Sequence, residues 1–269
     1  MPDQRPRILI TNDDGIQSPG LAAVAAALDD LGDLLLVAPQ KQQTSMSRAR
    51  TQSGEYNGLF KKHRVIYGKR EWEGIGINST PAVCVDYAVF EISPGPIDLV
   101  ISGINYGENI GTCVTVSGTI GAAIEAAERG IPALAVSLEL PGTDYHTLNK
   151  NVDFSAAMAF TRQFAIRVLA GKLPEDVDIL KIEIPAAATP QTPWIVTNQD
   201  RLAYYMPHLL PREDPYQQPG ILDHTPQKGK FIRENSDAYA QTKGWVSVTP
   251  LSINLTSRTN LSHLQSFLS

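Results

Sequence analysis

The chain has 269 residues and a mass of 29.3 kDa, with 42% hydrophobic and 19% charged residues. This much apolar material supports a substantial core and excludes a chain that is disordered throughout. The 23 basic and 28 acidic side chains give a formal net charge of −5, which disfavours stable binding of nucleic acid, because that function needs a basic face. The two cysteines, Cys84 and Cys113, exclude a disulfide scaffold and lie in apolar surroundings that indicate buried free thiols.

Neither a signal peptide nor a membrane-spanning segment is expected. The N-terminal sequence MPDQRPRILITNDDG has no apolar segment followed by a small-residue cleavage site. No stretch approaches the roughly 18 apolar residues that a membrane helix needs. We therefore expect a cytoplasmic protein that does not bind membranes.

The first half of the chain alternates short apolar runs with helical patterns. Residues 7–11 (RILIT) predict a buried strand, and Ser18-Pro19 predicts the start of a helix, with Ser18 as its N-cap. Because the apolar runs lack a polar face and alternate with helices, they predict an α/β fold with a mostly parallel sheet covered by helices. Further strands are predicted at 33–39, 97–103, 132–138, 179–185 and 244–251, and further helices at 117–127, at about 153–170 and in the last residues.

No clear linker divides the chain, so a single domain over residues 1–269 is expected. Its α/β core should span residues 7–185. After Pro185 the sequence becomes rich in Pro, Gln and Tyr, and its periodicity is weak. We interpret residues 186–256 as an extended arm that returns to the core at its end.

Two adjacent carboxylates follow the first predicted strand, in the sequence Asn12-Asp13-Asp14-Gly15. In open α/β sheets, the carboxyl edge of the parallel strands is where ligands bind. Two buried carboxylates are unfavourable unless something neutralises them. A hard divalent cation such as Mg²⁺ or Mn²⁺, which prefers oxygen ligands, would do so. The alternative is a simple turn, with Gly15 adopting a positive φ.

A glycine-rich loop, residues 102–123 (SGINYGENIGTCVTVSGTIGAA), connects another predicted strand to a helix that begins near Ser117. Free backbone N–H groups at a helix start favour phosphate. Ser117, Gly118 and Thr119 are the candidate phosphate-binding residues at that start. Asn12, Asn105 and Asn109 could add amide donors or oxygen ligands. The loop matches neither the Walker nor the dinucleotide-binding pattern, so an ordinary capped helix is the alternative.

Residues 41–70 contain eight Lys or Arg and a single acid, Glu55. A basic patch beside the sheet edge would steer phosphorylated substrates toward it. The alternative is a solvated loop or hairpin. The sequence has no G-x-S-x-G motif, and its five histidines show no metal-ligand spacing. Oxygen ligands beside a phosphate-binding loop suggest metal-assisted hydrolysis of a phosphate ester.

Several segments resemble the survival protein SurE family of 5′/3′-nucleotidases. They are ILITNDDGIQSPGL, LVISGINYGENIG, SGTIGAAIEAAERGIPALAVS and the late segment SDAYAQTKGWVSVTPLSINLT. The resemblance runs from about residue 7 to 256, with low similarity between about 186 and 235. It implies a Rossmann-like three-layer core, and homodimers or homotetramers built through C-terminal arms.

The resemblance also implies one divalent metal ion per subunit, Mg²⁺ or Mn²⁺. Its ligands would be Asp13, Asp14, Asn105 and, at the position of a family serine, Thr44, with Ser45 as the adjacent alternative. Asp13, Asp14 and Asn105 would also be the catalytic residues. The family's Asp-Arg pair is replaced here by Gln40-Lys41, and an acid of the family is replaced by Val83.

Three hypotheses for the function follow. The first is a metal-dependent phosphatase acting on nucleoside 5′- and 3′-monophosphates. The second is a non-catalytic module that binds nucleotides or phosphate, motivated by the substitutions at 40–45 and at Val83. The third is an exopolyphosphatase, suggested by the basic segment 41–70.

Overall fold

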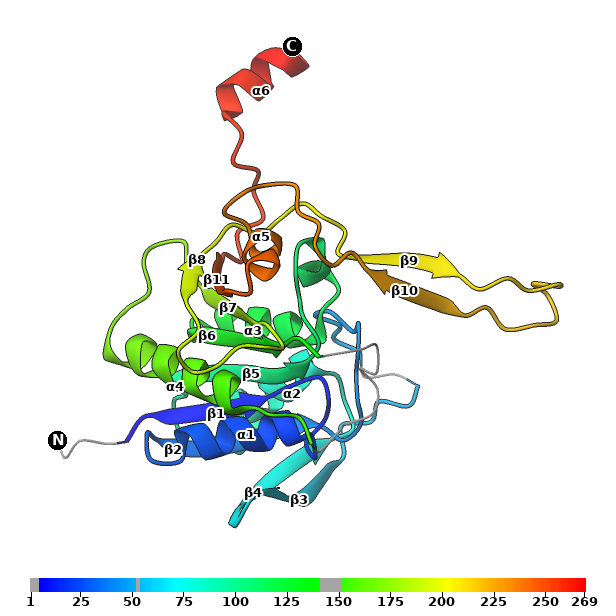
Figure 1. Cartoon of the computed structure of the whole chain (residues 1–269). Helices are drawn as coiled ribbons and strands as arrows, with labels where there is room; N and C mark the ends of the chain where they lie inside the picture. The colour runs from blue at the N-terminus through cyan, green and yellow to red at the C-terminus, as the bar shows by residue number, and fades with distance from the viewer. Residues whose placement is uncertain (1–4, 52–53, 141–150) are drawn as a thin grey trace.

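The computed structural model describes residues 5–51, 54–140 and 151–269. In these residues nine strands form one central sheet, in the order β3-β4-β2-β1-β5-β6-β7-β11-β8 (Figure 1). Strands β4, β2, β1, β5, β6 and β7 pair in parallel, whereas β3 and β11 run antiparallel to β4 and β7. The strands of this sheet are β1 (Arg7–Thr11), β2 (Asp33–Pro39), β3 (Phe60–Tyr67), β4 (Arg70–Ile77), β5 (Leu99–Tyr106), β6 (Ala133–Leu138), β7 (Ile179–Ile184), β8 (Trp194–Val196) and β11 (Val246–Leu251).

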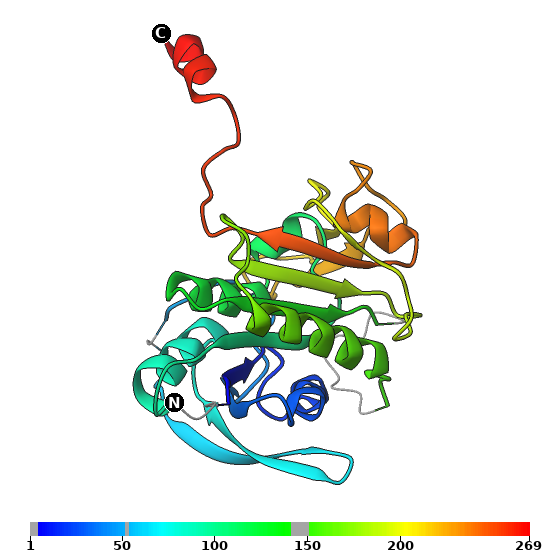
Figure 2. The same cartoon turned by 90° about the vertical axis from the view of Figure 1, so that its left-hand side faces the viewer.

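Helices cover both faces of the sheet, which makes three layers (Figure 2). Helices α1 and α4 pack with one apolar cluster, and α2 and α3 pack with a second cluster on the opposite face. The predicted α/β class is therefore confirmed. The helices are α1 (Pro19–Leu28), α2 (Pro81–Tyr87), α3 (Gly118–Glu128), α4 (Ser155–Ala170), α5 (Asp237–Thr242) and α6 (Leu261–Leu268), with a π-helical turn at Ala88–Ile92 and a 3₁₀ turn at Thr112–Thr115.

The start of α1 shows how local sequence sets the fold. The Ser18 hydroxyl accepts a hydrogen bond from Gly20 N at 3.2 Å, and Pro19 occupies the first turn, as predicted. A Cβ atom at Gly20 would lie 2.0 Å from the carbonyl oxygen of Ile104. A side chain is therefore excluded at Gly20, and α1 lies directly against β5.

The connections place a ligand-binding edge between β1 and β5. The β1–α1–β2 crossover lies on one face of the sheet, and α2 leads from β4 to β5 on the other face. The strand order therefore reverses between β1 and β5, which are direct neighbours. In open α/β sheets such a reversal opens a crevice at the carboxyl ends of the strands. The residues after β1 and those after β5 meet there.

The region after residue 185 is divided between the sheet and the periphery. Strands β8 and β11 join the central sheet, whereas β9 (Tyr205–Leu209) and β10 (Leu222–Pro226) form a separate ribbon. Figure 1 shows this ribbon and α6 projecting from the body in different directions. The predicted boundary between core and arm stays a prediction. None of the described helices is long and apolar enough to cross a membrane.

Candidate active site

The two carboxylates that follow β1 are buried at the carboxyl edge of the sheet. Asp13 and Asp14 are only 5% and 4% exposed. Asp14 accepts hydrogen bonds from the backbone N–H of Tyr106 and from Gln42 Nε2, both at 3.1 Å. Gly15 turns the chain with a φ of 101°, so the turn interpretation of this segment is also correct. The turn and the burial together direct both carboxylates into the fold.

Asp13 lies against the first turn of α3. Its Oδ1 atom accepts a hydrogen bond from Thr119 Oγ1 at 2.7 Å. A Cβ atom at Gly118 would lie 2.8 Å from Asp13 Cβ and 2.9 Å from Asp13 Oδ2, so only glycine permits this approach. The backbone N–H of Gln43 donates to the Asp13 carbonyl at 2.6 Å. The residue after β1 therefore contacts both α3 and the loop that follows β2.

The electrostatics of this pair are unfavourable without a cation. Burial raises the pKa of Asp13, and hydrogen bonds from Thr119 and the Gly118 backbone oppose that rise. Burial and the neighbouring Asp13 charge raise the pKa of Asp14 well above its usual range. Among the residues that the structure describes, no Lys, Arg or His forms an ion pair with either carboxylate.

The donor set at this edge fits a hard divalent cation. Asn105 Nδ2 donates to the Gly107 carbonyl at 2.6 Å. This bond leaves the Asn105 Oδ1 atom available as a ligand. Two buried carboxylates, an amide oxygen and a hydroxyl are the oxygen ligands that Mg²⁺ and Mn²⁺ prefer. Within the described ranges no three His, Cys, Asp or Glu side chains form a metal-binding group, so amide and hydroxyl oxygens would have to complete the site.

The predicted hydroxyl ligands lie on the loop after β2. Thr44 and Ser45 are exposed, and within the described chain neither forms a hydrogen bond with Asp13 or Asp14. The loop is fixed on both sides of them. Gln43 N bonds to Asp13, and Ser47 N donates to the Val116 carbonyl at 3.0 Å. The backbone that carries both hydroxyls is therefore anchored beside the start of α3, and the choice between Thr44 and Ser45 as the metal ligand stays a prediction.

Three other predicted phosphate-binding residues, Asn12, Ser117 and Asn109, each form a hydrogen bond within the chain. Asn12 is buried; its Oδ1 accepts from Gly15 N at 3.0 Å, and its Nδ2 has no hydrogen-bond partner in the described chain. Ser117 caps α3 by accepting from Ile120 N at 3.2 Å. Asn109 Nδ2 donates to Ser137 Oγ at 2.9 Å. The phosphate-binding role of these residues stays a prediction.

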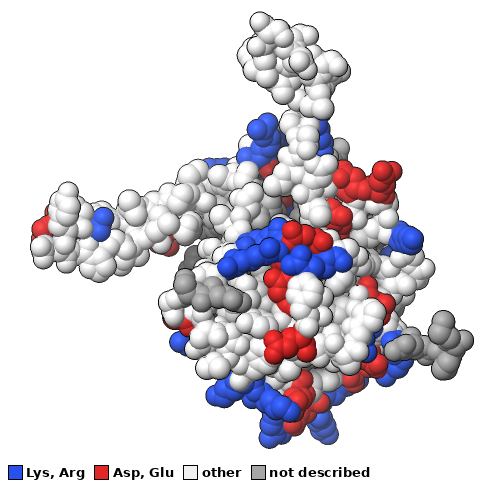
Figure 3. Space-filling view, turned by 180° about the vertical axis from the view of Figure 1, so that it is seen from behind, with Lys and Arg blue, Asp and Glu red and all other residues white. Residues whose placement is uncertain are grey.

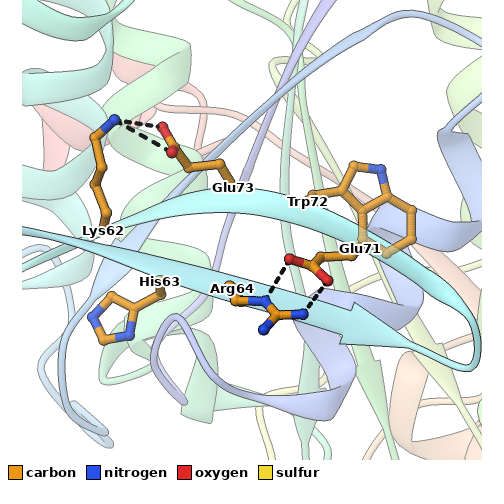
Figure 4. A pocket seen from close by; sticks show the side chains of 6 residues that line it. All are labelled: Lys62, His63, Arg64, Glu71, Trp72 and Glu73. Carbon is orange, nitrogen blue, oxygen red and sulfur yellow. Dashed lines mark hydrogen bonds and ion pairs between the residues drawn. The ribbon is translucent and has the colours of Figure 1, made fainter.

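The basic segment does not form the uniform patch that its composition suggested. Five of its eight cations form ion pairs with acids outside the segment. Figure 3 shows basic and acidic side chains side by side on one face of the molecule. In the shallow pocket on the β3–β4 hairpin, Figure 4 shows Lys62 paired with Glu73 and Arg64 with Glu71. The hairpin interpretation of this part of the segment was therefore the correct one.

Sequence reasoning missed a buried ionic cluster behind the glycine-rich loop. Lys181 is fully buried, and its Nζ donates to Asp237 Oδ2 at 2.8 Å and to the Asn109 carbonyl at 2.9 Å. Glu183 Oε2 accepts from Asn109 N at 2.9 Å. Asp237 Oδ2 also accepts from Gly111 N at 3.0 Å. The cluster therefore holds the loop 107–111 against β7 and α5.

Burial and the neighbouring charges act in opposite directions on the pKa values of this cluster. Burial disfavours the charged Lys181, but the carboxylates of Asp237 and Glu183 raise its pKa. Burial raises the pKa of Glu183 to about 7, although Lys181 opposes that rise. The signal in the sequence was the strand ILKIEIP, in which Lys181 and Glu183 alternate with apolar residues that face the core.

Comparison with known proteins agrees with this arrangement. The family model "Survival protein SurE" matches residues 8–205. A protein named 5′-nucleotidase SurE from Thermococcus gammatolerans is 40% identical, over 97% of this chain and 96% of that protein. One of the same name from Thermococcus kodakarensis is 38% identical, over 97% and 98%. The crystal structure of the SurE protein from Aquifex aeolicus superposes with a TM-score of 0.74 and 29% identity, covering 98% of this chain and all of that one. With a matching family model over most of its length and relatives that align end to end, this chain belongs to the survival protein SurE family.

Proposed function

We propose that this chain is a divalent-metal-dependent nucleotidase that releases phosphate from nucleoside 5′-monophosphates, and from 3′-monophosphates as a second substrate class. One observation carries the proposal. The buried pair of Asp13 and Asp14 has no basic partner in the described chain and lies at the ligand-binding edge of the sheet. The names of the relatives, 5′-nucleotidase SurE, support the part of the proposal that concerns nucleoside 5′-monophosphates.

The residues of the chain would have separate roles in binding the metal and the phosphate. Asp13, Asp14 and Asn105, with Thr44 or Ser45, would hold the metal. A bound divalent ion would supply Lewis-acid polarisation of the phosphoryl group and of the attacking water. Thr119 orients Asp13 through its 2.7 Å hydrogen bond. The Asn12 Nδ2 group, which has no hydrogen-bond partner in the described chain, and the Ser117 hydroxyl at the start of α3 would donate to the phosphate oxygens.

The hypothesis of an exopolyphosphatase loses its supporting observation. Five of the eight cations in residues 41–70 are ion-paired, so the segment does not offer a row of free cations for a polyanion. The non-catalytic binding module remains the competing hypothesis, because Gln40-Lys41 and Val83 depart from the family's pattern.

We also propose that the chain forms homodimers or homotetramers through its C-terminal arms. The β9–β10 ribbon and α6 project from the body and carry exposed apolar side chains, including Leu209, Leu222 and Phe267. Burying them against a second copy would remove apolar surface from water.

The experiment that tests the proposed function is release of inorganic phosphate from a panel of nucleoside 5′- and 3′-monophosphates, with Mn²⁺, with Mg²⁺ and with EDTA. We expect release that requires metal and favours nucleotides over glycerol phosphate. If the folded protein binds nucleotides tightly but releases no phosphate under any of these conditions, the result would favour the non-catalytic module instead.

A further inference from the structure

A cavity of about 530 Å³ lies along the loop that follows β2. This volume is within the range of about 300–1,000 Å³ that is typical of small-molecule sites. The loop after β2 forms much of its wall, including Gln42, Gln43 and Thr44. Gln42 also donates a hydrogen bond to Asp14 Oδ1 at 3.1 Å, so it contacts both the candidate active site and the cavity. A substrate with its phosphate at the carboxylate pair could therefore extend its other half into this cavity.

One wall of the cavity contains an aromatic ring that a hydrogen bond holds in place. Tyr56 lines the cavity, and its hydroxyl donates to Gln43 Oε1 at 2.9 Å. This bond directs the Nε2 group of Gln43 away from Tyr56, where it can donate to a ligand. Asn78, on the same wall, donates to the Glu55 carbonyl at 2.8 Å, which leaves its Oδ1 as an acceptor. The wall thus combines a π surface with amide groups that can pair with a heterocycle.

The charges around the cavity select against a polyanion. One basic residue, Lys41, and one acidic residue, Glu55, line it, so their formal charges cancel. The remaining lining residues are neutral amides, Thr44, Met46 and Tyr56. A chain of phosphates would need several unpaired cations here. A neutral aromatic base attached to a sugar needs stacking and amide contacts, which this wall supplies.

We infer that this cavity binds the nucleoside half of the substrate, with the base stacked on Tyr56 and its edge paired with the carboxamides of Gln43 and Asn78. The inference rests on the proposed function, because it assigns a place to the part of a nucleoside monophosphate that does not react. It makes Tyr56 a specificity-determining residue, with no part in the phosphoryl chemistry.

The test compares a substrate that has a base with one that lacks it. Adenosine 5′-monophosphate and ribose 5-phosphate share the sugar and the phosphate. We expect Tyr56→Ala to raise KM for adenosine 5′-monophosphate by about 5- to 100-fold, because stacking on the base is lost. The kcat/KM for ribose 5-phosphate, or its Ki if turnover is too slow to measure, should change by less than about twofold. Tyr56→Phe should keep most of the preference for the nucleotide, because it keeps the ring.

A matched control is Tyr216→Ala, since this tyrosine is 93% exposed and lies on the turn of the projecting ribbon. Tyr216→Ala should leave the ratio of kcat/KM for adenosine 5′-monophosphate to kcat/KM for ribose 5-phosphate unchanged. If Tyr56→Ala lowered kcat/KM equally for both substrates, or for neither, the assignment of the cavity would be overturned.

A binding measurement separates this inference from the proposed function. Calorimetric titration of adenosine, which has no phosphate to release, should give binding to the wild type and much weaker binding to Tyr56→Ala. If the wild type binds adenosine in this Tyr56-dependent way but hydrolyses no nucleotide, the assignment of the cavity is supported and the proposed nucleotidase activity is contradicted. If the wild type hydrolyses nucleotides but Tyr56→Ala binds adenosine equally well, the cavity assignment fails alone.

Discussion

Replacing Asp14 by Asn should reduce kcat/KM for nucleoside 5′-monophosphates by about 10²–10³-fold or more, the order of loss seen when an enzyme loses one group that stabilises developing charge. Asp14→Asn keeps the size of the side chain and an oxygen that can accept from Tyr106 N. It removes the second charge of the carboxylate pair, and with it much of the affinity for a divalent cation.

The same change should not destabilise the metal-free protein. Burial and the Asp13 charge already hold the pKa of Asp14 well above its usual range, so loss of the charge relieves repulsion. The free energy of unfolding, measured in EDTA, should therefore be unchanged or higher. The matched control is Asp33→Asn, because Asp33 is exposed at the opposite, amino-terminal end of β2. It should keep activity within about twofold. Wild-type kcat/KM in Asp14→Asn would contradict the role given to the pair.

Replacing Lys181 by Met should lower the free energy of unfolding by about 3–5 kcal/mol, the cost of removing one partner from a buried ion pair. Lys181→Met leaves Asp237 and Glu183 buried without their cation. It also removes the hydrogen bond that holds the Asn109 carbonyl at 2.9 Å. Nucleotidase activity should therefore fall as well, because the loop 107–111 loses an anchor. Urea unfolding, analysed by linear extrapolation, measures the change in stability.

An exposed lysine provides the control for this substitution. Lys62 pairs with Glu73, but their side chains are 77% and 64% exposed. Lys62→Met should therefore cost only about 0–1 kcal/mol. The double variant Lys181→Met/Asp237→Asn should recover part of the loss, because it removes an unpaired buried charge. Similar small costs for Lys181→Met and Lys62→Met would show that the buried cluster does not stabilise the fold.

The features that could be predicted from the sequence are those set by neighbouring residues. The strand at Arg7–Thr11 and the helix start at Ser18-Pro19 depend on apolar runs and capping within a few positions, and both are confirmed. The meeting of Asp13 with Thr119 followed from a general rule of parallel sheets, because Asp13 follows β1 and the loop after the neighbouring strand β5 leads to the start of α3.

The features that could not be predicted depend on partners that are distant in the chain. Arg48 and Arg50 pair with Glu125 on α3, and a charge count over 41–70 alone could not include that partner. The pairing of Lys181 with Asp237 joins β7 to α5 across 56 positions. The cavity beside Tyr56 requires the loop after β2 and the end of β4 to meet, which neither segment indicates by itself.

The most direct test of the account is a calorimetric titration of Mn²⁺ into the metal-free chain and into the double variant Asp13→Asn/Asp14→Asn. The account predicts one Mn²⁺ bound per wild-type chain and no measurable binding to the double variant. Equal Mn²⁺ binding by both proteins, or nucleotide hydrolysis by the wild type that persists in EDTA, would contradict the claim that this carboxylate pair is the metal site of a nucleotidase.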